Sequence, residues 1–173
     1  MFLFKTYTHQ GAVVVDILVG VSILVVALTS LLGFVSFAAS SFGIYTRTTQ
    51  ATFLAQEIAE ALRNYRDGIL WNIDGPGVEY DGLGVLAVGA PYHLEKSADT
   101  PPRWKTVEGT ESVGAFTRSL TLGDVQRDVS DNIVVSGGIL DPSTKKITIT
   151  IAWQEKGVPR STEFTTYLTN WLQ

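Results

Sequence analysis

The stretch from Ile17 to Phe37 most limits what this chain can form, because it contains no charged residue. It meets the roughly 20-residue length that a helix needs to cross about 30 Å of hydrocarbon. Its Leu, Ile, Val and Phe side chains favour insertion by roughly 4 to 8 kcal/mol. Asp16 stands at the start of the run, where a carboxylate costs less than the about 2.5–3.5 kcal/mol expected at a helix centre. The sequence therefore predicts a membrane-spanning helix.

The segment before Gly11 is short and polar, and Lys5 is its one formal positive charge. By the positive-inside rule, Lys5 places this end in the cytoplasm and the rest of the chain beyond the membrane, outside the cytoplasm. A signal peptide cut after residues 36–38 is the alternative, although its apolar core would be longer than usual.

The helix is expected to continue past the membrane run. After Gly43 the apolar residues recur at helical spacing, and no Pro interrupts the pattern before a stop at Gly68. We predict one helix from Ala12 to Arg66, roughly 80 Å long at 1.5 Å per residue. Its first half is apolar all round and its second half is amphipathic. The expected buried residues of the second half are Ala51, Leu54, Ile58, Ala61, Leu62 and Tyr65. The expected exposed residues are Gln56, Glu57, Glu60, Arg63 and Asn64.

The remainder of the chain indicates a loop-rich segment followed by strands. Residues 68–115 hold half of the Gly residues and most of the Pro residues, so we expect turns there, with a short hairpin formed by 91–95 and 102–108. Residues 116–122, 146–153 and 160–168 alternate as strands do. Residues 136–138 and 141–146 are expected to separate strands. One face of the second strand carries Ile147, Ile149, Ile151 and Trp153.

These elements predict an α+β domain in which the apolar face of an antiparallel sheet packs on the amphipathic half of the helix. We divide the chain into residues 1–11, a membrane-spanning part at 12–43, and a head at 44–173. Within the head, residues 68–115 form the loop-rich part and residues 116–173 form the strands.

A short leader, a glycine, an apolar run with an acid at its fifth residue, one long helix and then a sheet resemble the type IV pilins and pseudopilins. "LAQEIAEALRNYRD" and "KKITITIAWQEKGVPRSTEFTTYLTNW" look most like minor pilin sequences. The resemblance implies that a prepilin peptidase cleaves after Gly11 and that Ala12 becomes the N-methylated terminus. Asp16 would pair with the terminal amine of a neighbouring subunit.

The resemblance also implies partners and a location. The partners would be other pilin subunits, the prepilin peptidase, and an assembly platform in the membrane with its ATPase. The chain would lie in the cell membrane before assembly and in a pilus or pseudopilus afterwards. Asp16, where the family usually has Glu, and Ala12, where a bulky apolar residue often comes first, fit a minor subunit.

Asp16 has two physical interpretations. A carboxylate in hydrocarbon is costly alone and tolerable when it is paired with a cation, which favours a role in assembly. The other interpretation is an acid near a helix end that snorkels to headgroup water and has no partner.

Composition argues against other function classes. The chain contains no Cys and only two His, His9 and His93, which removes thiol catalysis and Cys-ligated metals. Neither a nucleophile elbow nor a Gly-rich phosphate loop is present in the sequence. The net charge is −4 and the basic residues are scattered, which does not suggest nucleic acid. We therefore expect no enzymatic activity, no cofactor and no direct nucleic-acid partner.

Several single residues were weighed against ordinary structural roles. Asp74, Glu79 and Asp81 offer oxygen ligands to Ca²⁺, but their spacing fits no EF-hand loop, so we expect no metal site. His93 is expected in a strand or loop. Arg118 is expected to snorkel at the sheet edge or to pair with an acid of the helix.

The alternative to filament assembly is an uncleaved, single-pass anchored protein whose outer β-rich domain binds a ligand or another protein. An intact leader in protein taken from cells would favour it, as would normal behaviour after Asp16→Ala. A membrane-tethered hydrolase lacks any supporting group of residues.

Overall fold

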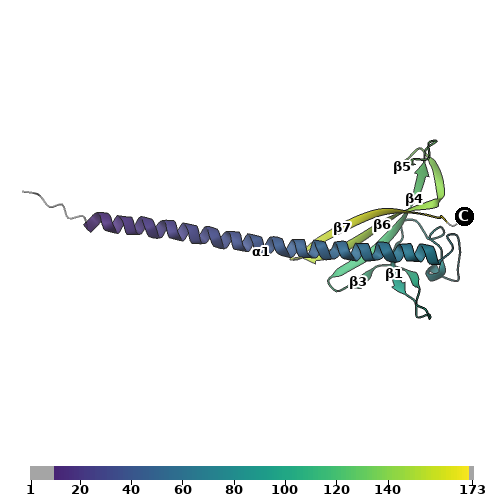
Figure 1. Cartoon of the computed structure of the whole chain (residues 1–173), viewed down its shortest axis with the longest axis horizontal. Coiled ribbons are helices and arrows are strands. Elements are labelled where there is room, and N and C mark those ends of the chain that lie inside the picture. Colours follow the sequence, from purple (N-terminus) through teal and green to yellow (C-terminus); the bar gives the residue numbers. More distant parts are fainter. Residues whose placement is uncertain (1–9, 172–173) are drawn as a thin grey trace, which may run out of the picture. The chain divides into compact units, whose positions relative to one another are not determined.

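The computed structural model of the chain describes residues 10–171. Its first element is the helix α1, Gln10–Gly68, which is followed by an antiparallel sheet (Figure 1). The predicted long helix is confirmed, and it extends slightly beyond both expected ends. The chain divides into two compact units, the first ending at Thr46 and the second beginning at Arg47. The first unit belongs to α1, and the second holds the end of α1 and the whole sheet.

The sheet has the order β2-β1-β4-β6-β7, with β3 and β5 each paired to β4, and its pairings are antiparallel. Strands β2 and β7 therefore form its edges. The strands are β1 (Pro91–Lys96), β2 (Trp104–Glu108), β3 (Glu111–Val113), β4 (Phe116–Arg127), β5 (Ile133–Val134), β6 (Ile139–Glu155) and β7 (Val158–Thr169). A short 3₁₀ turn, η1 (Val78–Tyr80), precedes them. The α+β layout and the predicted hairpin of β1 and β2 are confirmed.

The core of the second unit lies between α1 and one face of the sheet. The strand residues Ile147, Ile149 and Ile151 are at most 1% exposed, and Trp153 is also buried, as the alternation predicted. The helix contributes a stripe at spacings of three and four residues, which points one side toward the sheet. Its buried members are Ala51, Ala55, Ile58, Ala61, Leu62 and Tyr65.

Two details of the helix stripe differ from the prediction. Leu54 is only half-buried at the border of the stripe, whereas Ala55, which was not predicted as core, is 1% exposed. Ala55 follows Ala51 by four residues and so lies directly above it on the same face. The buried stripe of the helix thus includes small as well as large side chains.

The segment at 141–146 does not separate strands as predicted. It lies within β6, which continues from Ile139 to Glu155. The pairing of β6 with β4 is shifted there, since Lys145 stands opposite Asp124 while Asp141 stands opposite Val125. Such a bulge leaves extra residues unpaired and lets a strand accept a Pro, which cannot donate to the ladder.

The loop-rich segment contributes more to the core than its composition indicated. Trp71, Leu83 and Leu86 are buried although none of them lies in a helix or strand. Trp71 is also fixed by a hydrogen bond from its Nε1 to the carbonyl oxygen of Pro142, at 3.0 Å. The sequence predicts turns in this segment, but it does not predict these three buried side chains.

Candidate functional site

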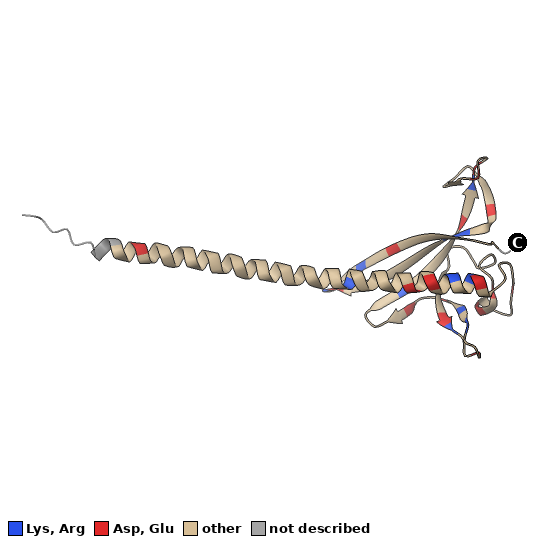
Figure 2. Cartoon of the chain, viewed as in Figure 1, with Lys and Arg blue, Asp and Glu red and all other residues tan. Residues whose placement is uncertain are grey.

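The first candidate site is the apolar half of α1, residues 13–46. Within residues 10–171, one helix is long and apolar enough to cross a membrane by its length and composition, and its most apolar window has a mean hydropathy of 2.6. Every residue from 13 to 37 is exposed. Asp16 is the one charge of this half, and the next charged residue along α1 is Arg47 (Figure 2).

The polar side chains in this half are hydrogen-bonded to their own helix. The hydroxyls of Ser22, Thr29 and Ser30 donate to carbonyl oxygens three or four residues earlier, at 2.7–3.0 Å. Backbone and side-chain polar groups must be satisfied internally in hydrocarbon, because no water is available there. These three hydroxyls therefore meet the condition for residence in a membrane, whereas the Asp16 carboxylate has no hydrogen bond to a described residue.

Asp16 is exposed and has no cationic partner among the described residues. No cation occurs on α1 from Ile17 to Thr46, so the segment that follows Asp16 offers none. The predicted cleavage and methylation residues, Gly11 and Ala12, fall within the bounds of α1. Lys5 and the rest of residues 1–9 lie outside the described residues.

Gly20 and Gly33 add a second feature to this surface. A Cβ built at either glycine would meet no other atom of the chain within 4 Å, apart from the helix's own neighbouring backbone. Small residues on membrane helices allow a second helix to approach closely. The space beside these glycines is therefore open to a packing partner.

The acidic residues of the loop segment have structural partners. Glu79 Oε2 lies 2.9 Å from Lys105 Nζ, and this hydrogen bond raises the pKa of Lys105. Asp81 Oδ1 accepts the backbone N–H of Gly75 at 2.8 Å. Two of the three carboxylates considered for calcium thus hold the loop to β2 and to itself. In the described part of the chain, no three Asp, Glu or His side chains gather as metal ligands.

Arg118 forms a charged link between α1 and the sheet. It is 8% exposed on β4, its Nε lies 2.5 Å from Glu111 Oε2, and its Nη1 lies 3.4 Å from Glu57 Oε1. Of the two roles expected for Arg118, the structure shows pairing with an acid of the helix, and it adds a shorter contact with Glu111 of β3. His93 lies in β1 as expected, with Nε2 at 3.0 Å from Glu95 Oε1.

No family model, no curated protein and no solved structure matches this chain. The resemblance to type IV pilins therefore rests on the residues and the architecture already described.

Proposed function

We propose that this chain is a minor type IV pilin or pseudopilin, a non-enzymatic subunit that joins a pilus or pseudopilus through its N-terminal helix. The observation that supports this most is the apolar half of α1. It is exposed over all of residues 13–37 and carries one carboxylate at its N-terminal end. A surface of this kind is stable in hydrocarbon or in a bundle of similar helices, and it is unstable in water.

The rest of α1 explains how such a helix would be attached to a folded head. Its final turns bury Ile58, Leu62 and Tyr65 against the sheet, so the helix and the sheet share one core.

Asp16 has the position that an assembly contact requires. Ala12 and Asp16 are four residues apart, which places them on one face of α1, one turn from each other. Cleavage after Gly11 would create a positive amine at Ala12, beside this carboxylate and within reach of the same groups on a neighbouring helix. Pairing removes most of the cost of a carboxylate in an apolar bundle. The prepilin peptidase, other pilins, and a membrane platform with its ATPase are the partners that this function requires.

The first test is the intact mass and N-terminal sequence of the protein from native membranes and from sheared surface fibres. We expect a chain that begins at methylated Ala12. A chain in both fractions that still carries residues 1–11 would contradict the proposal and would favour an ordinary membrane anchor.

The second test compares Asp16→Ala with Asp16→Glu. Asp16→Ala should still enter the membrane, since the apolar run is unchanged, but its amount in sheared fibres should fall about tenfold or more, as expected for a lost charge pair. Asp16→Glu keeps the charge and should assemble nearly as the wild type does. Ser22→Ala is the matched control, because it changes another polar residue of the same helix. Equal amounts of all four proteins in fibres would exclude the assembly role of Asp16.

A further inference from the structure

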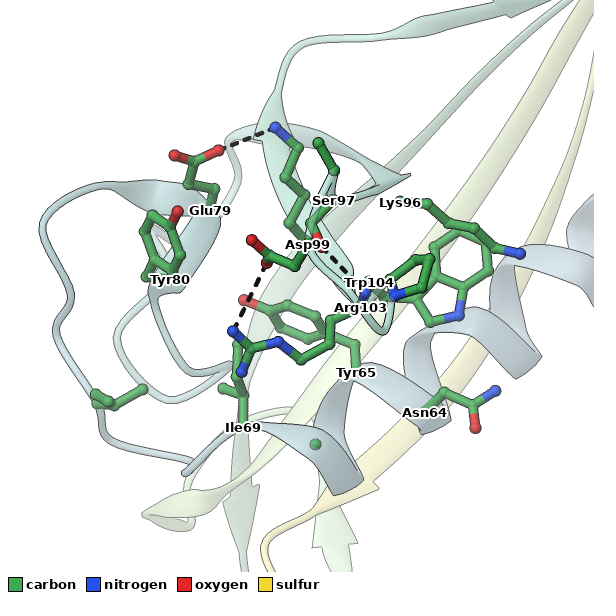
Figure 3. Close-up of a pocket in the computed structure, with 15 residues that line it drawn as sticks. Asn64, Tyr65, Ile69, Glu79, Tyr80, Lys96, Ser97, Asp99, Arg103 and Trp104 are labelled. Atoms are coloured by element: carbon green, nitrogen blue, oxygen red, sulfur yellow. Dashed lines mark hydrogen bonds and ion pairs between the residues drawn. The ribbon is translucent and has the colours of Figure 1, made fainter.

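The second unit contains a cavity of about 720 Å³ that the assembly function does not use. It lies between the end of α1, the loop that carries η1, and the tip of the β1–β2 hairpin (Figure 3). We call it the hairpin pocket. Its volume is within the range of about 300–1,000 Å³ that is usual for small-molecule sites. All of its lining residues lie between Asn64 and Lys105, so the pocket belongs to one unit.

The hairpin pocket has an excess of positive charge in a chain whose net charge is −4. Three cations line it, Lys96, Arg103 and Lys105, against two carboxylates, Glu79 and Asp99. Lys105 is neutralised by Glu79 at 2.9 Å. The other two cations are held much less closely.

Arg103 and Lys96 retain unused donors. Arg103 Nη2 is 3.7 Å from Asp99 Oδ2, which is too long for a hydrogen bond, and within residues 10–171 its guanidinium donates no hydrogen bond. Lys96 Nζ lies 5.3 Å from the ring centroid of Trp104 and has no carboxylate partner among the described residues. A guanidinium with free donors binds a carboxylate through two parallel hydrogen bonds. The pocket is therefore suited to an anionic group.

The remaining lining is both aromatic and hydrogen-bonding. Trp104 is half-buried in one wall, and Tyr80, 43% exposed, stands in the loop on another side (Figure 3). The Ser97 hydroxyl oxygen accepts the Arg103 backbone N–H, so its own hydrogen is free to donate. Aromatic faces receive the C–H face of a sugar ring, and hydroxyl and amide groups pair with its hydroxyls.

We propose that the hairpin pocket binds a saccharide that carries a carboxylate, such as a uronic acid or a sialic acid. Arg103 would hold the carboxylate, Trp104 would support the ring, and Ser97 would hydrogen-bond to its hydroxyls. An aromatic acid would leave the Ser97 hydroxyl unpaired, and a neutral sugar would leave the donors of Arg103 unused. The proposal does not depend on filament assembly.

The test uses the full chain in detergent micelles, with isothermal titration calorimetry of sialyllactose and of an oligogalacturonate. The two probes distinguish the two sources of a sugar carboxylate, and lactose is the neutral control. We expect one acidic probe to bind at least about tenfold more tightly than lactose, as expected for one charged hydrogen-bonded contact. Binding should weaken as salt is added.

Three variants separate the pocket from general electrostatics. Arg103→Gln should weaken binding of the acidic probe about tenfold. Asp99→Asn should tighten it several-fold, because it removes the carboxylate that competes for Arg103. Arg160→Gln, an exposed position on β7 outside the pocket, makes the same charge change and should have no effect. A gain of affinity in Asp99→Asn also excludes loss of folding as the cause.

Three outcomes would overturn the proposal. They are no binding of either acidic probe, lactose binding as tightly as both, and equal effects of Arg103→Gln and Arg160→Gln.

Discussion

Removing Glu111 should destabilise the second unit more than removing Arg118, the cation that it neutralises. Arg118 is 8% exposed and lies between Glu111 of β3 and Glu57 of α1. Burial alone would lower the pKa of Arg118, but the hydrogen bond to Glu111 and the charges of Glu111 and Glu57 outweigh it and raise the pKa. The guanidinium thus stays charged at a site where a charge needs its partners.

The magnitudes follow from which group each variant leaves behind. Glu111→Ala leaves a buried cation with only Glu57 nearby, which should cost about 2–3 kcal/mol. Arg118→Met keeps an apolar stem of similar length, and the side chains of Glu111 and Glu57 that remain are 28% and 55% exposed, so water solvates them. This variant should cost about 0–1 kcal/mol. When Arg118→Met is already present, adding Glu111→Ala should lower the free energy of unfolding only slightly further. The coupling between the two substitutions should thus be about 2 kcal/mol.

The measurement is urea unfolding of the full chain in micelles, followed by the fluorescence of the buried Trp153 and by circular dichroism of the sheet. With a slope of about 1–3 kcal/mol per M, a loss of about 2–3 kcal/mol in Glu111→Ala should lower the urea midpoint by roughly 0.7–3 M. Glu57→Ala is the matched control, because its exposed side chain should contribute less than about 1 kcal/mol. If Arg118→Met costs as much as Glu111→Ala and does not suppress it, the account of an uncompensated buried charge is wrong.

Two further predictions concern the loop beside the hairpin pocket. Tyr65→Phe should cost about 1–2 kcal/mol, because the Tyr65 hydroxyl donates to the carbonyl of Asp81 and lies 3.2 Å from Thr106 Oγ1. Burial raises the pKa of Tyr65 above its usual 10.0 in the folded state. The folded state therefore favours the neutral hydroxyl, and this stabilisation is present below about pH 10 and is lost as the pH rises through the folded pKa. The urea midpoint of the wild type should thus fall more steeply above about pH 10 than that of Tyr65→Phe. Gly82→Ala should lower the free energy of unfolding by about 2–4 kcal/mol in the same assay, because its Cβ would lie 2.2 Å from two backbone carbonyl oxygens. Gly77→Ala is the control, because a Cβ there meets no atom within 4 Å, and it should change the free energy of unfolding by less than about 0.5 kcal/mol. Equal effects of the two variants would refute this.

The helix and the strands could be predicted because each has one period that covers many residues. The spacing of Ile58, Leu62 and Tyr65 indicates a helix face, and the alternation from Ile147 to Trp153 indicates a strand. Ala55 was missed because a small side chain gives a weak hydrophobic signal, although it is almost fully buried in the structure. The hydrophobic pattern thus predicted where the core lies better than it predicted which small residues complete it.

Features that depend on distant contacts were not predictable from local pattern. Asp141 and Pro142 indicate a turn when they are read alone, yet β6 continues through them, because Asp141 and Lys145 pair with neighbouring residues of β4 on either side of the bulge. Trp71 is buried in an irregular segment, and its hydrogen bond reaches Pro142, 71 residues later. The hairpin pocket is a similar case, because its lining comes from α1, the η1 loop and the β1–β2 hairpin, and no single segment carries its pattern.

In the proposed function, Asp16 would affect both membrane insertion and fibre assembly through one energy difference. The apolar run favours insertion by roughly 4 to 8 kcal/mol, which exceeds the about 2.5–3.5 kcal/mol upper cost of an unpaired carboxylate, so the helix can enter the bilayer with Asp16 unpaired. The same exposed run makes release into water unfavourable, and a bundle of like helices is the other environment that covers it. In that bundle Asp16 would gain a cationic partner that no described residue supplies. We infer that the Asp16 carboxylate makes insertion into the membrane less favourable and packing into the helix bundle more favourable. Asp16→Ala should therefore keep the subunit in the membrane, because transfer from the membrane to the bundle becomes less favourable.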